Sequence, residues 1–171
     1  MSDSPIKPPA LGALRTALEM RRQREAEAEK ELKRKADEQQ SDLRRRLENF
    51  EVTDADRQMI NEKIKQAFER NEKELMFASF PSEICTDGGR AIINAHEPPL
   101  NPRPKEQKDN EPDWVATLPM GFRRVYEDWK EHLKPAGYDF SARIVSYPDG
   151  KPGDVGLFFS WSIHEDTGAE R

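Results

Sequence analysis

The sequence predicts an α+β fold in which a long, charged N-terminal helix and a second helix form a helical hairpin ahead of a small domain. That domain is expected to contain a three-stranded, mainly antiparallel sheet covered by helices, in the order β-α-α-β-β. Three observations predict this fold. Residues 11–75 contain no proline and, after Gly12, no glycine; residues 118–134 carry a helical apolar stripe; and residues 140–163 alternate around a turn rich in proline and glycine.

The composition shows that part of the chain is not packed. Charged residues make up 36% and hydrophobic residues 35% of the 171 residues, against roughly 25% and 45–50% in compact domains. We expect polar tails at residues 1–10 and 165–171. Cys85 is the single cysteine, which favours a reducing, cytoplasmic setting. No run of 18 apolar residues and no apolar leader is present, so we expect no membrane association.

Residues 11–52 are predicted to form one long helix, possibly paired in a coiled coil. Leucines recur at spacings of three, four or seven residues, but charged residues replace them between 19 and 31. Acid–base pairs such as Glu31 with Lys35 would support the helix there. Because such a stripe buries little on itself, we expect a protein partner, in a homo-oligomer or a hetero-complex. The predicted partner-binding leucines are Leu11, Leu14, Leu18, Leu32, Leu43 and Leu47.

A second helix is predicted over residues 53–75, packed on the small domain. Thr53 is a good N-cap, and Asp56 occupies the capping-box position three residues later. Ile60, Ile64 and Phe68 share one face of this helix and need cover. The part that projects freely is then residues 11 to about 45.

The small domain is predicted to span residues 76–164, with a helical apolar face packed against a sheet. In chain order we expect a strand at 75–80, a helix that begins near 82 or 87, a mobile proline-rich loop at 96–113, a helix at 118–134, and strands at 140–147 and 155–163. On the last strand, Val155, Leu157 and Phe159 share the face that meets the helix.

The opposite face of the sheet is a second candidate partner-binding surface. Arg143, Tyr147 and Phe158 point to that face by strand alternation. Aromatic and arginine side chains on a sheet can stack the bases of a single-stranded nucleic acid. The sequence favours a different fate for this face, because the two N-terminal helices need a surface to pack on and would cover it.

Residues 87–90, Asp-Gly-Gly-Arg, form a possible anion site. Two glycines ahead of a helix can turn backbone N–H groups toward an anion, so Gly88, Gly89 and Arg90 are the candidate residues. No Lys-Ser/Thr pair follows them, as a phosphate-binding loop would require. A tight turn between a strand and a helix explains the same residues.

The sequence shows no complete catalytic or metal-binding set. Cys85, Asp87 and His96 could combine a thiol, a carboxylate and an imidazole, but their spacing matches no nucleophile–base arrangement. The three histidines of the chain share no ligand spacing. We therefore predict no catalytic residue, no cofactor and no metal.

Charge distribution helps to rank the function classes. Residues 15–46 hold eleven Lys/Arg and eight Asp/Glu, and Lys7 cancels Asp3, so a net charge of −8 falls on residues 47–171. An acidic domain is repelled by polyphosphate, which makes nucleic acid a less favoured partner.

The preferred hypothesis is a non-enzymatic interaction, scaffold or adaptor protein that associates through its N-terminal helix and presents an acidic domain. The alternatives are a nucleic-acid-associated regulator that uses the helix arginines and the aromatic sheet face, and a small enzyme centred on Cys85, Asp87 and His96.

Overall fold

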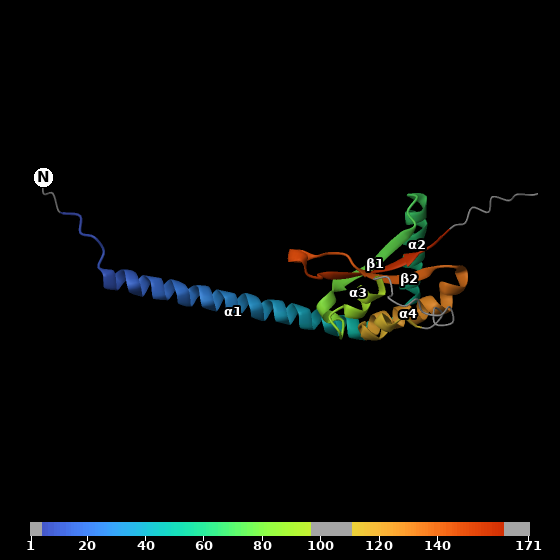
Figure 1. Cartoon of the computed structure of the whole chain (residues 1–171), viewed down its shortest axis with the longest axis horizontal. Coiled ribbons are helices and arrows are strands. Elements are labelled where there is room, and N and C mark those ends of the chain that lie inside the picture. Colours follow the sequence, from blue (N-terminus) through green and yellow to red (C-terminus); the bar gives the residue numbers. More distant parts are fainter. Residues whose placement is uncertain (1–4, 97–110, 163–171) are drawn as a thin grey trace, which may run out of the picture. The chain divides into compact units, whose positions relative to one another are not determined.

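The computed structural model of the chain describes residues 5–96 and 111–162 (Figure 1). Most of the predicted loop at 96–113 and the predicted tail at 165–171 lie outside these residues. In chain order the elements are α1 (Leu11–Asn49), α2 (Asp54–Glu69), β1 (Glu74–Pro81), α3 (Arg90–His96), α4 (Met120–His132), β2 (Asp139–Ile144) and β3 (Asp154–Ser160). Short 3₁₀ helices occupy Ser82–Ile84, Asp113–Thr117, Lys134–Ala136 and Pro148–Gly150. The predicted α+β fold is confirmed.

The chain divides into two units, residues 1–43 and residues 44–171; the second is called the compact unit below. The first unit is helical from Leu11 onward, and α1 contains no buried residue. Its regular backbone is supported by local pairs on its own surface. Glu31 pairs with Arg34 rather than with the predicted Lys35, and Arg34 also contacts Glu38 at 3.3 Å.

The compact unit is built on a three-stranded sheet with the strand order β1-β3-β2, in which both neighbouring pairs are antiparallel. The last strand in the chain is therefore the central one. Phe159 of β3 lies opposite Leu75 of β1 and Phe140 of β2, which sets the register. β3 ends at Ser160, earlier than predicted, and the N–H of Trp161 bonds to the carbonyl of Lys73 at 3.1 Å.

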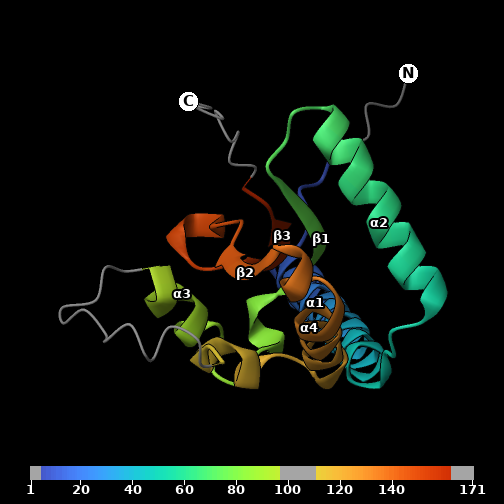
Figure 2. The same cartoon turned by 90° about the vertical axis from the view of Figure 1, so that its right-hand side faces the viewer.

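In the described part of the compact unit, helices cover one face of this sheet, as the sequence predicts. The α4 side chains Phe122, Tyr126 and Trp129 are buried, and the Phe122 ring stacks on Phe80 of β1 with centroids 4.9 Å apart. α2 runs beside β1 and α3 beside β2 (Figure 2). Phe140 contacts both Tyr126 and Trp129, so the aromatic core lies between α4 and the sheet.

A β-bulge interrupts the pairing of β1 with β3 between Met76 and Ala78. Phe77 is the extra residue, and its ring stacks on Phe159 with centroids 4.2 Å apart. Because Ala78 pairs with Leu157 on the same face, two consecutive residues of β1 now point toward the helices. Strict alternation of side chains along a strand would send one of them to the other face.

α2 begins with the predicted capping box. The Thr53 hydroxyl accepts the N–H of Asp56 at 3.3 Å, and the Asp56 carboxylate accepts the N–H of Thr53 at 2.9 Å. Ile64 and Ala67 are buried, whereas Phe68 is exposed. Since α2 shares a groove with Phe77 and Phe159, it lies on the helix-covered face and does not cover the other face of the sheet, which is called the open face below.

The last turn of α1, from Arg44 onward, belongs to the compact unit and packs on the start of α4. A Cβ added at Gly121 would fall on the carbonyl oxygen of Leu47 and lie 2.8 Å from the Cβ of Phe50. The Arg124 guanidinium donates to the carbonyl of Phe50 at 2.8 Å. Glycine at 121 therefore allows the backbone of α1 to approach α4 closely.

Candidate binding groove

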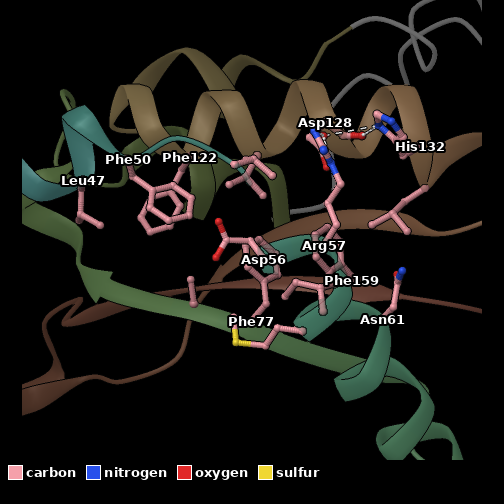
Figure 3. A pocket seen from close by; sticks show the side chains of 16 residues that line it. Leu47, Phe50, Asp56, Arg57, Asn61, Phe77, Phe122, Asp128, His132 and Phe159 are labelled. Carbon is pink, nitrogen blue, oxygen red and sulfur yellow. Dashed lines mark hydrogen bonds and ion pairs between the residues drawn. The ribbon is translucent and has the colours of Figure 1, made fainter. Parts of the chain in front are cut away.

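A largely apolar groove of about 440 Å³ opens between α2 and α4 on the helix-covered face of the sheet (Figure 3). Its floor is formed by Phe77 and Ala78 of β1 and Phe159 of β3. Its volume falls within the roughly 300–1,000 Å³ that is typical of ligand pockets. The walls are formed by Leu47, Phe50 and Val52 before α2, by Met59 and Ile60 of α2, and by Phe122, Val125 and Leu133 of α4 and its C-cap.

Two features keep the groove open. The β-bulge turns Ala78 into the floor beside Phe77, and the alanine methyl fills little of the space between the two helices. In addition, the sheet does not fully cover the apolar face of α4. Val125 and Leu133 are only half-buried and line the groove, while Phe122 and Trp129 are buried.

A charged cluster forms one end of the groove. Arg57 of α2 donates from Nε and Nη2 to the same oxygen of Asp128 on α4, at 2.9 and 2.7 Å, and from Nη1 to Asp54 at 2.5 Å. The Asp128 and Asp54 carboxylates together raise the pKa of Arg57 above its usual range. His132 places Nδ1 3.5 Å from the Asp128 carboxylate. Because Arg57 already has two carboxylate partners, the cluster ties the two walls together more than it offers a cation to a ligand.

The structure divides the predicted leucine series into two parts. Leu11, Leu14, Leu18 and Leu32 are exposed on α1. Leu43 and Leu47 are half-buried, and Leu47 lines the groove.

On the open face of the sheet, Arg143 and Phe158 come together, but each already has a partner. The Arg143 guanidinium lies 3.7 Å above the Phe158 ring and forms two hydrogen bonds with the Glu74 carboxylate. Glu74 raises the pKa of Arg143, and Arg143 lowers the pKa of Glu74. Phe158 is only 5% exposed, whereas Tyr147 is exposed in the loop after β2. Arg143 therefore covers the Phe158 ring on which a nucleic-acid base would have to stack.

At the predicted anion site, an internal carboxylate already occupies the backbone amides. Asp87 accepts the N–H of Gly89 at 2.9 Å and the N–H of Ala91 at 2.8 Å. Gly88 and Gly89 have φ values of +68° and +88°, so they form the left-handed turn into α3. Arg90 is exposed. These contacts agree with the alternative interpretation, a tight turn between a strand and a helix.

Cys85 has the environment of a packing residue. It is 3% exposed, and burial raises the pKa of its thiol to about 11. A thiol with this pKa is almost fully protonated at neutral pH and is a poor nucleophile. The side chain of His96, its proposed partner, lies outside the described part of the structure.

Neither a metal-binding cluster, nor a membrane-spanning helix, nor a similarity to known proteins assigns a function to this groove. No group of three or more His, Cys, Asp or Glu residues that could hold a metal occurs in the described part of the chain. No helix within residues 5–96 and 111–162 is long and apolar enough to cross a membrane. Compared with known proteins, the chain matches no family model, no curated protein and no solved structure.

The groove itself could not be recognised from sequence patterns. Ile60 and the apolar stripe of residues 118–134 are visible in the sequence, but the pattern predicts only that they pack inside the domain. Arg57 and Asp128 are 71 residues apart, and nothing local links them. Met59, next to Ile60 in the sequence, is a hint that could have been used, because a large apolar side chain beside a helix stripe widens the apolar face.

Proposed function

We propose that this chain is a non-enzymatic interaction protein that associates through the first turns of α1 and carries its compact unit into a protein assembly. The observation that supports this is the exposure of Leu11, Leu14 and Leu18. Their spacing of i, i+3 and i+7 aligns them on one side of the helix within about 11 Å. These three residues are called the N-terminal stripe below. Helices with such anchors dock into apolar grooves of other proteins or of other copies.

The charges around the N-terminal stripe also lack internal partners. Residues 11–24 hold four arginines and one glutamate. On a helical wheel Arg21 lies on one side of the stripe, and Arg15 and Arg22 lie on the other. Within the described part of the chain these three arginines form no ion pair, whereas Arg34 is bound by Glu31 and Glu38. The first turns of α1 therefore combine apolar anchors with unpaired positive charge.

The two alternatives receive less support. In a nucleic-acid regulator, Arg143 and Phe158 would have to be released from each other and from Glu74. Residues 44–171 carry 19 Lys/Arg and 24 Asp/Glu, a net charge of −5 that repels polyphosphate. An enzyme centred on Cys85 would start from a thiol whose pKa burial has raised to about 11.

Site-specific photocrosslinking in the full chain tests this proposal. A photoreactive residue is placed at position 14, or at the control position 20, and the protein is incubated in native extract. Leu14 and Met20 are both 49% exposed, but Met20 lies on the opposite side of the helix. We expect protein adducts at position 14 that are at least several-fold more abundant than at position 20. Equal or negligible crosslinking at both positions would refute an interaction through this stripe.

A further inference from the structure

Two apolar surfaces of the chain are uncovered, the groove of the compact unit and the N-terminal stripe of α1. We propose that the N-terminal stripe of one copy of this chain, Leu11, Leu14 and Leu18, docks in the groove of a second copy. This inference rests on the proposed function, and it identifies the partner as a second copy. It also assigns the groove between α2 and α4 as the receptor site.

The apolar surfaces match in kind. The groove offers aromatic and aliphatic walls, including Phe77, Val125 and Phe159, in a volume of about 440 Å³. Three leucines at i, i+3 and i+7 are the anchors that a helix presents to such a groove. Met59 is 49% exposed where α2 lines the groove, so an incoming helix would cover it as well.

The charges are complementary. The N-terminal stripe lies in a segment of net charge +3, and the compact unit carries −5. Glu51, Glu127 and Glu131 lie on the surface that continues from the groove past Asp128. These three glutamates are exposed and form no ion pair among the described residues. The arginines of this surface, Arg57, Arg123 and Arg124, already donate to carboxylates or backbone carbonyls.

A second copy explains both surfaces with one type of contact. Every chain has one N-terminal stripe and one groove, so two chains can satisfy each other in a closed, two-fold arrangement. A small acidic ligand is a poorer occupant, since the Arg57 guanidinium is already matched by Asp54 and Asp128. Leucine side chains would leave the hydrogen bonds and ion pairs of that cluster intact.

Four single variants of the full chain test the contact. Leu14→Glu disrupts the stripe and Met59→Glu the groove, while Met20→Glu and Met76→Glu are the controls on the far side of α1 and on the open sheet face. All four residues are 49% exposed, so none is a core residue. Sedimentation equilibrium at low salt should show a wild-type dimer that weakens as salt is raised. We expect Leu14→Glu and Met59→Glu each to raise the dissociation constant at least tenfold, and both controls to leave it within about twofold.

Mixing the two disruptive variants separates this model from other dimers. Leu14→Glu retains an intact groove and Met59→Glu an intact stripe, so the mixture can still form one of the two contacts. The mixed sample should associate more tightly than either variant alone and more weakly than the wild type. A coiled coil between two stripes would instead be insensitive to Met59→Glu.

Several results would overturn the inference. One is a Leu14→Glu variant that fails to associate while Met59→Glu associates normally; this result leaves the proposed function intact, because the stripe still mediates association. The same conclusion follows if the wild type is a monomer and a photoreactive residue at position 14 crosslinks to a different protein. A small apolar molecule found in the groove by native mass spectrometry, with Met59→Glu losing it, would assign the groove to a ligand. If Leu14→Glu leaves association unchanged and a photoreactive residue at position 14 gives no more crosslinking than one at position 20, the proposed function fails together with the inference.

Discussion

Arg57 and Asp128 join α2 to α4 across the end of the groove, with both Nε and Nη2 of the arginine donating to a single carboxylate oxygen. Asp128 is largely buried, with a side chain 17% exposed. A carboxylate in this position needs its partner more than a surface carboxylate does. The two helices that form opposite walls are thereby held at a defined separation.

The contribution of this pair is measurable in a double-mutant cycle. Arg57→Gln and Asp128→Asn should each lower the midpoint of thermal unfolding, and the double variant should lose less than the sum of the two losses. High salt should reduce the coupling between them only in part, because Asp128 is shielded from solvent. Strictly additive losses would show that the two side chains do not interact in solution.

Substitution of Gly121 by alanine should lower the stability of the protein. Alanine normally stabilises a helix by up to about 1 kcal/mol relative to glycine. At position 121 the new Cβ would collide with the Leu47 carbonyl and the Phe50 side chain, so we expect Gly121→Ala to destabilise the protein by about 1–3 kcal/mol. Gly12→Ala is the control, since nothing lies within 4 Å of that position. Urea denaturation of both variants checks the sign, and stabilisation by Gly121→Ala would contradict the close approach of α1 and α4.

Cys85 should react slowly with thiol reagents in the folded protein. With its pKa raised from 9.0 to about 11, the thiolate fraction near pH 8 is about 100-fold smaller than for an ordinary cysteine. Alkylation with iodoacetamide, followed by mass spectrometry with and without urea, measures this difference. Rapid alkylation of the native chain would revive the hypothesis of an enzyme centred on Cys85.

The same pKa shift predicts how stability changes at alkaline pH. Between pH 9 and pH 11 the unfolded chain loses the Cys85 proton while the folded chain keeps it, so the free energy of unfolding should fall with rising pH. The full contribution is at most about 3 kcal/mol, present below pH 9 and lost as the pH passes 11. Cys85→Ala should flatten this part of the profile relative to the wild type. Identical profiles for both proteins would contradict the shift.

Asp87 should act as an internal cap of the turn into α3. Removing its carboxylate in Asp87→Ala leaves the amides of Gly89 and Ala91 without their partner, and the expected cost is about 1 kcal/mol. Added phosphate should not stabilise the wild type. If phosphate raises the thermal midpoint of the wild type as well as that of Asp87→Ala, the predicted anion site at Gly88, Gly89 and Arg90 is real.

Local chemistry in the sequence was sufficient to predict the type and order of the main helices and strands, but not where each one ends: the helix predicted at 53–75 ends at Glu69, and the strand predicted at 140–147 ends at Ile144. The α4 stripe, the capping box at Thr53 and Asp56, and the alternation of Val155, Leu157 and Phe159 are short-range patterns, and each appears in the structure as expected. The exposed leucines of α1 follow from the same kind of pattern. Each of these features depends on side chains a few residues apart, whose geometry a helix or a strand sets by itself.

Only the tertiary structure revealed the groove and the partners of the candidate residues. The bulge at Phe77 depends on how β1 pairs with β3, about eighty residues later in the chain. Glu74 meets Arg143 and Arg57 meets Asp128 across separations of 69 and 71 residues. Such contacts arise from strand register and helix packing, which no local spacing encodes. The sequence by itself therefore determined the elements and the exposed stripe, whereas long-range pairing decided which side chains are engaged and which surface stays open.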